Sequence, residues 1–568
     1  MRRKAMALPA AVLGTALALT LSGCKGGGTS AAQQADPGAD AATGGTVHVL
    51  ANADFSHLDP ARGFDGGVNN FYRLMYRTLT TQAAAPGAKG TKVVGDLATD
   101  AGKPSDGNKT WTFRLKSGIA FQDGSEISSE DVKFGVERAW DPDAGIGSPY
   151  AKQYIEAPAD YQGPYKSGSL SSIETPDEHT IVFHLKKATA QFGYIAAQPT
   201  FTPFPKGSGA KAAFDREPIA SGPYKVKSYQ RGSKLVLVRN KAWKRSTDEV
   251  RDAKPDSFVW TFGLDNATID ERLIAGQGAD ANAITGAAQL QPATVSRIQT
   301  PQLKKRTLSG MTGCTSYMSI NTRKGPLKDV RVRQAIEYAV NKQTTVDAHG
   351  GSSLATVATS IEPPVVPGRD ATDMYPSKHG TGDVKKAREL LADAGKSKGF
   401  TFTLDTRAAE VEQATAVSIQ QSLKRVGIKV KVNTIDTSTF YEVIGTPSQQ
   451  HDGALTGWCP DWPGGSTFLP PLFDGRNIAA SGNQNIFMLD DKRINERMDA
   501  IDAMSDPDTQ NAAYGKLDGQ IMKRAPIVPL HYTKTVSVVG DNIAGAYLSQ
   551  SFSGGIDLVS VGLADPKK

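Results

Sequence analysis

The residues with the clearest chemical potential are one aromatic–acidic run and three cysteines. The run, Gly457-Trp458-Cys459-Pro460-Asp461-Trp462, places a carboxylate between two tryptophans. A carboxylate held in a water-poor setting makes a strong charge-assisted hydrogen bond with a cation. Taken alone, the same run also fits a core tryptophan followed by an acid in a turn. The cysteines, Cys24, Cys314 and Cys459, are odd in number, so any disulfide framework would leave one over.

Catalytic and metal-binding patterns are sparse. The sequence has no H-E-x-x-H zinc motif and no Walker phosphate loop. Its eight histidines do not pair at metal-ligand spacing, and three widely spaced cysteines cannot form a zinc knuckle. We therefore expect a protein that is not an enzyme and needs neither cofactor nor metal. An exported hydrolase that captures a peptide or glycan is the rival class, and a turnover assay on labelled peptides would decide between them.

Length and charge limit the architecture and the partners. A chain of 568 residues exceeds what one hydrophobic core usually organises, so two or three lobes are expected. Hydrophobic residues make up 39% and charged residues 22%, which is typical of a globular protein rather than a membrane or disordered one. The formal charge of +7 is spread thinly beyond the first four residues. Charge therefore gives no support to nucleic-acid binding.

The N-terminus carries an export signal. Residues 2–4 are basic and precede an apolar run at 5–21 that is too short and too alanine-rich for a stable membrane span. The sequence L-S-G-C at 21–24 resembles the bacterial lipoprotein box. We expect residues 1–23 to be removed as a signal peptide, which lowers the formal charge to +4, and the Cys24 thiol to carry a diacylglycerol. The alternative is a secreted protein with a chance cysteine near its cleavage site.

Residues 24–45 separate this signal from the globule. They are rich in Gly, Ala, Gln and Asp and have no periodic apolar face, so they are expected to form a flexible tether. Two acyl chains anchor stably, whereas one binds membranes only marginally. The globule, beginning near Thr46, is therefore expected at the outer face of the cytoplasmic membrane, held there by lipid.

The elements that must position the chemistry follow an α/β pattern. Large apolar residues alternate over 111–115, which predicts one buried face of a strand. Ser128 and Asp131 predict the cap of a following helix. The stretch 400–433, with a helix at 410–424, predicts a strand–helix–strand unit, which normally closes a parallel pair by a right-handed crossover.

Several ordered motifs resemble one family. The stretch Trp111–Trp140, WTFRLKSGIAFQDGSEISSEDVKFGVERAW, is similar to the signature region of the large extracytoplasmic solute-binding proteins of peptide-type ABC importers. Further matches follow in order at 221–224 (SGPY), 326–335 (PLKDVRVRQA) and 387–395 (AxxLLxxAG). The matches span about residues 46–535. The chain is identified as a member of solute-binding family 5, which contains oligopeptide- and dipeptide-binding lipoproteins.

This resemblance implies an architecture. The family fold is α/β and periplasmic-binding-protein-like, with two large lobes of mixed sheets joined by a two-strand hinge, plus an extra subdomain. By analogy the chain crosses between the lobes near Gly313–Ser316 and near Pro526–His531, and the lobes close around a ligand. The implied division is 46–88 with 215–313 and 530–568 for lobe I, 89–214 for the extra subdomain, and 314–529 for lobe II.

The resemblance also gives the aromatic–acidic run a role. In peptide-binding members a G-W-x-x-D run lines the cleft. Asp461 is thereby implied to accept the α-ammonium group of the ligand, and Trp458 to form a pocket wall. Gly457 and Cys459 are implied to contribute backbone groups.

Two further points of the site come from the same resemblance. Phe64, in the early Phe64-Asp65-Gly66 segment, is implied to face the cleft. Some oligopeptide binders meet the ligand carboxylate with a basic residue three positions before the tryptophan, and here that position is Leu455. Arg407 and Lys424 are alternatives between which the sequence does not choose.

A disulfide between Cys314 and Cys459 is implied as well. Oligopeptide-binding members carry a cysteine pair at equivalent places, and an exported location permits the bond. With Cys24 assigned to lipid, the odd cysteine count has an explanation. The alternative is a pair of buried free thiols.

The expected function follows. We expect a lipid-anchored, monomeric component of an ABC importer that captures peptides, with oligopeptides favoured over dipeptides, and delivers them to the transmembrane permease subunits. Nucleic acid is not an expected partner. Because relatives capture sugars, metal complexes or opines, a non-peptide ligand is the alternative, and the pair of Trp458 and Asp461 is the feature that discriminates.

Overall fold

The computed structural model describes the chain from residue 38 to residue 568, except residues 65, 145–146, 209–213 and 287–289. The signal peptide and the predicted lipidation site, Cys24, lie outside the described residues. Within the described ranges, no helix has both the length and the apolar character needed to cross a membrane.

The predicted tether ends earlier than expected. The backbone N–H of Ala42 donates to the carbonyl of Leu563 at 2.8 Å, and Gly44 donates to Lys254 at the same distance. The ordered fold thus begins before Thr46. Its pairing partners come from distant parts of the chain, so local composition could not reveal them.

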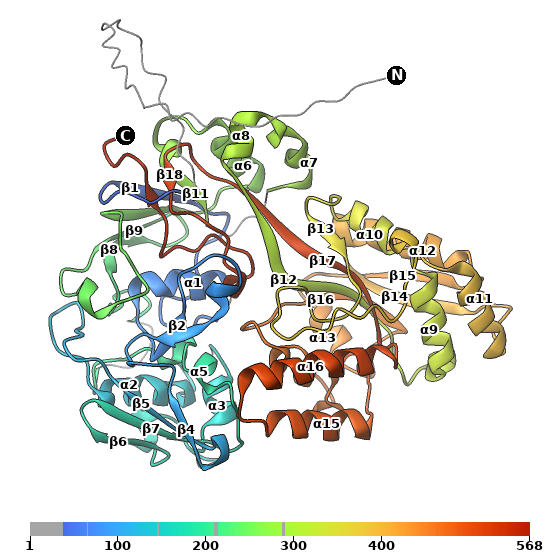
Figure 1. Ribbon diagram of the computed structural model, residues 1–568, viewed down its shortest axis with the longest axis horizontal. Helices are drawn as coiled ribbons and strands as arrows, with labels where there is room; N and C mark the ends of the chain where they lie inside the picture. Colours follow the sequence, from blue (N-terminus) through green and yellow to red (C-terminus); the bar gives the residue numbers. More distant parts are fainter. Residues whose placement is uncertain (1–37, 65, 145–146, 209–213, 287–289) are drawn as a thin grey trace, which may run out of the picture. The chain divides into compact units, whose positions relative to one another are not determined.

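The first sheet has five strands in the order β11-β1-β10-β9-β8 (Figure 1). β1 is parallel to β10 and β11, while β10, β9 and β8 pair antiparallel. Val49 of β1 and Trp260 of β10 are buried in the same core, beneath helix α1 (Gly66–Met75). The strands are β1 (Thr46–Leu50), β8 (Tyr224–Gln230), β9 (Lys234–Arg239), β10 (Ser257–Thr261) and β11 (Ala283–Thr285).

A smaller, four-stranded sheet has the order β4-β5-β7-β6. The predicted alternation is confirmed, since Trp111, Phe113 and Leu115 are buried and Arg114 is exposed. The predicted cap is also present, because the backbone N–H of Ser128 donates to Asp131 Oδ2 at 2.9 Å at the start of α2. The elements are β4 (Lys103–Ser105), β5 (Thr110–Arg114), α2 (Ser129–Glu137), α3 (Tyr150–Tyr154), β6 (Ile173–Asp177), β7 (Thr180–His184) and α5 (Phe192–Ile195).

The second large sheet has six strands in the order β13-β17-β12-β16-β14-β15. β14 is parallel to both β15 and β16, and the other pairs are antiparallel. The predicted strand–helix–strand unit is confirmed as β14, α12 and β15. The strands are β12 (Thr307–Ser319), β13 (Ala355–Val357), β14 (Thr401–Arg407), β15 (Lys429–Ile435), β16 (Gly453–Trp458) and β17 (Ile527–Val538).

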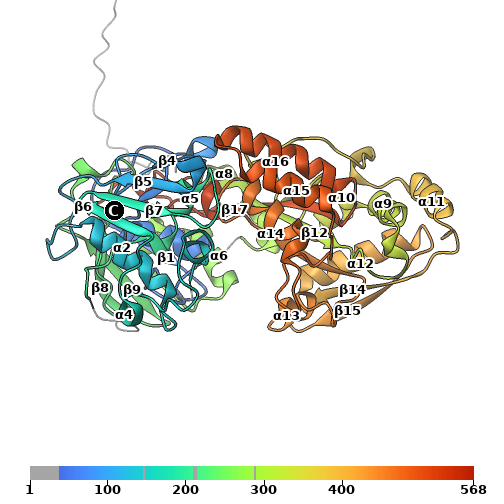
Figure 2. The same ribbon diagram turned by 90° about the horizontal axis from the view of Figure 1, so that it is seen from below.

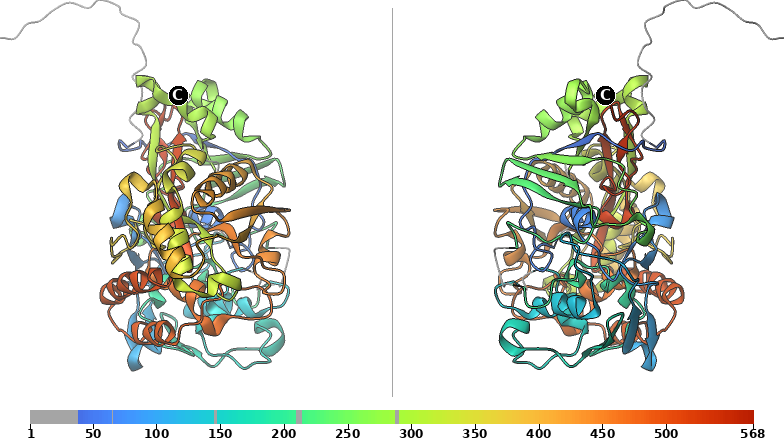
Figure 3. Two further views of the ribbon diagram at one scale, coloured as in Figure 1. Left: turned by 90° about the vertical axis from the view of Figure 1, so that its right-hand side faces the viewer. Right: turned by 90° about the vertical axis from the view of Figure 1, so that its left-hand side faces the viewer.

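Helices on this second sheet bury its apolar side chains in two clusters. The yellow and orange helices face the viewer in the left view of Figure 3, and α15 and α16 run side by side in Figures 1 and 2. The helices are α9 (Val330–Ala339), α10 (Lys342–Ala348), α11 (Val384–Asp393), α12 (Glu410–Lys424), α15 (Lys492–Asp502) and α16 (Pro507–Met522).

The long strands β12 and β17 pair along most of their length and connect the cores of the two large sheets. Val536 of β17 is buried with Leu50 of β1, near the first sheet. At the other end, Met318 of β12 belongs to a core of the second sheet. Two adjacent strands that continue from one core into another are the geometry of a hinge.

The pairing of these strands is interrupted between Met311 and Thr315. Gly313 lies in this gap with φ +81°, a conformation that favours glycine. The first predicted crossing falls at this point. The second strand crosses later than predicted, because His531 still pairs with Val357 of β13 in the second sheet. The boundary predicted at residue 530 therefore falls inside a paired strand.

The expected disulfide is present. Cys314 lies on β12 beside the interruption, and Cys459 directly follows β16. Thr315 pairs with Trp458 across these two strands, so the register brings the two cysteines opposite each other. The bond closes a segment with a sequence separation of 145 residues. In the chain-entropy description a loop of this size contributes about 5 kcal/mol.

Replacing both cysteines by serine should lower the free energy of unfolding by about 2–5 kcal/mol, since the unfolded chain regains the entropy of the open loop. Urea unfolding followed by circular dichroism measures the change. Reduction of the wild-type protein with dithiothreitol should have the same effect and serves as the control. An unchanged urea midpoint after complete reduction would contradict this role.

His531 makes stability depend on pH. The side chain is buried, neither ring nitrogen has a hydrogen-bond partner among the described residues, and the ring lies 4.4 Å from that of His349. Burial, with a smaller contribution from the nearby His349, lowers the pKa of His531 to about 3. The unfolded state takes up a proton near pH 6.5, so stability from this group is present above that pH and is lost as the pH falls towards 3.

We predict that lowering the pH from 7.5 to 5 reduces the free energy of unfolding of the wild-type protein by about 2 kcal/mol more than it reduces that of His531→Phe. Urea unfolding of both proteins at the two pH values tests this. Because other titrating groups are common to both proteins, their effects cancel in the difference. Equal losses in the two proteins would show that His531 is not buried in its neutral form.

Candidate ligand-binding site

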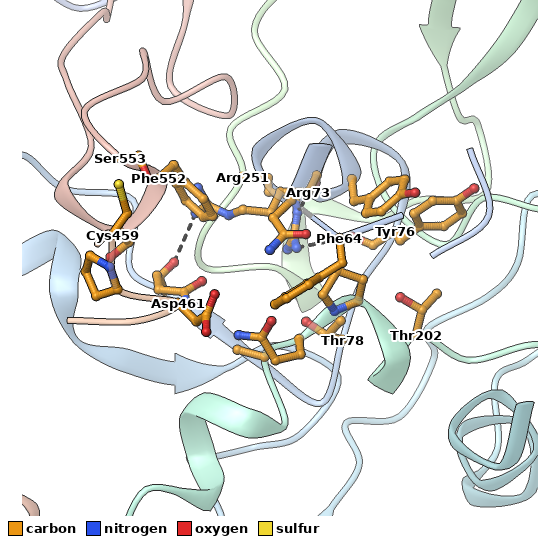
Figure 4. Close-up of a pocket in the computed structure, with 18 residues that line it drawn as sticks. Phe64, Arg73, Tyr76, Thr78, Thr202, Arg251, Cys459, Asp461, Phe552 and Ser553 are labelled. Atoms are coloured by element: carbon orange, nitrogen blue, oxygen red, sulfur yellow. Dashed lines mark hydrogen bonds between the residues drawn. The ribbon is translucent and has the colours of Figure 1, made fainter. Parts of the chain in front are cut away.

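Segments that are distant in the sequence meet around a cavity of about 160 Å³ (Figure 4). One wall comes from α1 and the residues that flank it, between Phe64 and Gln82. A second comes from residues 197–202, which follow α5. Residues 459–461, after β16, and residues 551–553 complete the lining together with Arg251.

Asp461 contributes a carboxylate to this cavity. Its Oδ2 accepts a hydrogen bond from the Tyr150 hydroxyl. Burial raises the pKa of Asp461, and the Tyr150 hydrogen bond opposes that rise. Across the described ranges, no lysine, arginine or histidine forms an ion pair with Asp461. A carboxylate removed from water without a cation is costly, so the site favours a positively charged ligand group.

Tyr150 contacts Asp461 but does not itself line the cavity. Its ring lies edge-on to Trp462, with centroids 4.8 Å apart, and to Phe64, with centroids 6.2 Å apart. Burial and the adjacent Asp461 raise the pKa of the Tyr150 hydroxyl, so it remains a neutral donor. The contact therefore orients the carboxylate without neutralising its charge.

Trp462 fixes the backbone beside Asp461. Only 2% of Trp462 is exposed, and it packs into the core whose other buried members lie between residues 79 and 201. Its Nε1 donates to Gln191 Oε1 at 2.5 Å, and Gln191 Nε2 donates to Gln510 Oε1 at 2.8 Å. This buried polar network holds the turn that carries Asp461 against the four-stranded sheet.

The structure places the predicted site residues in two groups. Phe64, Cys459 and Asp461 line the cavity. Gly457 pairs with Ser316 inside the sheet and does not line it. Trp458 does not line it either.

The role of Trp458 as a pocket wall therefore stays a prediction, and this cavity does not include it. Its indole Nε1 donates to the Thr467 carbonyl at 2.6 Å, and its ring packs on the core beside α14 (Leu469–Phe473). The ring lies on the face of β16 that serves this core, so the alternative of a core tryptophan describes Trp458 better.

The residues considered for a ligand carboxylate also lie elsewhere. Leu455 is buried in the core of the second sheet. Arg407 pairs with Glu412 on α12, and Lys424 is exposed. None of the three lines the cavity.

Several cavity residues carried no signal in the sequence. Arg73, Gln198, Thr202 and Phe552 belong to stretches without a recognisable motif, and only the folded chain brings them together. Arg73 could have been noticed as the one charged residue of α1, but nothing local connects it to Asp461.

The arrangement offers little to a hydrolase. The string Gly395-Lys396-Ser397-Lys398-Gly399 does match the G-x-S-x-G pattern of nucleophile elbows. It follows helix α11 and precedes strand β14, which is the reverse of the strand–turn–helix that the elbow requires. Its serine is also absent from the cavity lining. Within the described parts of the chain, no group of three or more His, Cys, Asp or Glu side chains could hold a metal ion.

Known proteins resemble this chain in both sequence and fold. The glutathione-binding protein GsiB of Salmonella typhi is 25% identical over 513 residues, which cover 88% of this chain and 92% of that protein. The solved structure of clavulanic acid biosynthesis oligopeptide binding protein 2 is 33% identical, has a TM-score of 0.88, and covers 94% of this chain and 99% of its own.

A third neighbour supports the fold alone. The periplasmic binding protein DppA of Helicobacter pylori, solved in complex with the peptide STSA, has a TM-score of 0.67 at 24% identity. The alignment covers 92% of this chain and 99% of the neighbour. These likenesses confirm the predicted α/β fold of periplasmic binding proteins.

The sequence profile of bacterial extracellular solute-binding proteins, family 5 (middle region), matches residues 92–480. This range includes the four-stranded sheet, β12 and the turn that carries Asp461. The chain therefore belongs to family 5 of the extracytoplasmic solute-binding proteins, the ligand-binding components of ABC importers.

Proposed function

We propose that this protein captures peptides outside the cytoplasmic membrane and delivers them to an ABC permease, with the α-ammonium group of the peptide bound by Asp461. The observation that carries the proposal is a cavity-lining carboxylate that has a hydroxyl partner but no cation among the described residues. A peptide ammonium supplies the missing charge. Their charge-assisted hydrogen bond is strong because the site is shielded from water.

The relatives support a peptide ligand. By their names, GsiB binds glutathione and the clavulanic acid biosynthesis protein binds oligopeptides, and the Helicobacter pylori neighbour holds a tetrapeptide. Glutathione is itself a peptide with a free ammonium group. A site built around one unpaired carboxylate suits all of these ligands better than it suits a neutral sugar.

The membrane anchor belongs to the same proposal. The lipobox-like sequence at 21–24 and the tether that follows it support anchoring of the binding domain at the outer face of the cytoplasmic membrane, where a permease can receive the ligand. Two acyl chains on Cys24 provide stable attachment.

Asp461→Asn should weaken binding of trialanine by about 10–100-fold, because the neutral amide cannot pair with the ammonium group. Isothermal titration calorimetry at pH 7.5 measures the effect. N-acetyl-trialanine should bind the wild-type protein with a similar loss. Glu442→Gln, which changes an exposed acid outside the cavity, should leave the affinity unchanged and is the matched control.

Equal affinity of wild type and Asp461→Asn for trialanine would remove Asp461 from the ligand site. Failure of the folded wild-type protein to bind any free peptide would overturn the proposed function itself.

Cys24→Ser should release the protein from the membrane. Without the thiol no diacylglycerol can be attached, and a protein that has lost its lipid partitions into the aqueous fraction. Phase partitioning of expressing cells into detergent and aqueous fractions measures this, with the wild-type protein as the detergent-phase control. Retention of the serine variant in the detergent phase would contradict lipid anchoring at this residue.

A further inference from the structure

The disulfide between Cys314 and Cys459 is accessible to solvent. Cys459 is exposed and lines the cavity, and Cys314 is half-buried. Figure 4 shows Cys459 on the same side of the cavity as Asp461. Exposed disulfides exchange with thiols more readily than those that only hold a fold together. A thiol in solution can therefore reach this bond.

The same bond is the main attachment of the turn at residues 459–461. The last paired residue of β16 is Trp458, and among the described residues no backbone hydrogen bond is made by residues 459–461. At the other end of the turn, Asp461 contacts Tyr150 and Trp462 is buried. Breaking the disulfide thus leaves the first half of the turn without a tie to the second large sheet.

The other end of the bond lies where the pairing of β12 and β17 is interrupted. Cys314 directly follows Gly313, and a Cβ placed on Gly313 would lie 3.7 Å from Pro460 Cγ. Pro460 therefore packs beside the point where the strands bend. The disulfide joins the segment that carries Asp461 to the strand that positions it.

We propose that the Cys314–Cys459 disulfide is a site of thiol–disulfide exchange, and that its reduction by a dithiol weakens peptide binding by releasing the turn that carries Asp461. This inference rests on the proposed function. In the oxidised protein the turn is ordered before the ligand arrives. In the reduced protein the ligand must also order the turn, and the conformational entropy lost in doing so is subtracted from the affinity.

The exchange balances with a dithiol as the reductant. One thiolate attacks the sulfur of the exposed Cys459, the bond to Cys314 breaks, and Cys314 leaves as a thiolate that takes up a proton. The second thiol of the reagent then attacks the mixed disulfide as a thiolate and releases Cys459, which is protonated in turn. Two electrons and two protons pass from the dithiol to the protein, and the reagent becomes a disulfide.

Calorimetry on the oxidised and the reduced protein tests the effect on binding. Cys24→Ser leaves Cys314 and Cys459 as the only cysteines, and dithiothreitol is the dithiol. Reduction should weaken binding of trialanine by at least about fivefold, the lower end of typical coupling between two sites. The affinity for N-acetyl-trialanine should change little, because this ligand has no ammonium group for Asp461. A general loss of structure would weaken both ligands alike, so their difference isolates the turn.

Thermodynamic linkage supplies a second measurement on the same protein. If reduction weakens trialanine binding, saturating trialanine must disfavour reduction by the same factor. The ratio of reduced to oxidised dithiothreitol at half reduction should therefore rise at least about fivefold with trialanine and little with N-acetyl-trialanine. Trapping of the free thiols with a maleimide measures this ratio.

Replacing both Cys314 and Cys459 by serine provides the matched control. The variant should bind trialanine as weakly as the reduced protein does. Dithiothreitol should not change its affinity further.

The outcomes separate this site from the proposed function. Equal affinity of the oxidised and the reduced protein for trialanine would overturn the redox-sensitive site and leave peptide capture standing. Equal losses for trialanine and N-acetyl-trialanine, or loss of the native circular dichroism signal on reduction, would also overturn it, because the bond would then hold the whole fold. Absence of peptide binding by the oxidised protein would overturn the proposed function and this inference with it. Should the double serine variant fail to fold, the comparison of oxidised with reduced protein still decides.

Discussion

The structure depends on a short turn that is anchored at both ends. At one end Cys459 is covalently joined to Cys314 on β12, so the turn is tied to the second large sheet. At the other, Trp462 is buried in the core of the four-stranded sheet. Asp461 lies between these anchors, which hold its backbone beside the cavity. A carboxylate without a cation partner among the described residues is costly, and we propose that a ligand cation offsets this cost.

This turn lies beside the two long strands that connect the cores of the two large sheets. β12 and β17 carry the chain from the core around Leu50 to the core around Met318, with an interruption at Gly313. Cys314 is the next residue, so the disulfide attaches the turn beside the point where the strands bend. Rotation about this point would move the cavity walls formed by α1 relative to Asp461. Ligand binding between such walls is the hinge closure known from periplasmic binding proteins.

The local sequence pattern predicts much of the fold, but it does not predict most residues of the site. The alternation at 111–115 and the helix at 410–424 are set by neighbouring residues, and the structure has both where the sequence places them. The family motifs led to the Cys314–Cys459 bond and to the cavity position of Asp461. They did not indicate that Trp458 packs beside α14, since the face of a strand on which a tryptophan packs depends on a core assembled from distant segments. Arg73 and Gln198 could not be found for the same reason.

We propose that Asp461 binds the ammonium group of a peptide ligand. A crystal structure of the wild-type protein with bound trialanine tests it most directly. We expect the ammonium nitrogen of the peptide within about 2.7–2.9 Å of an Asp461 carboxylate oxygen, the distance of a charge-assisted hydrogen bond. A bound trialanine whose ammonium group lies in solvent, or against another acid, would contradict it.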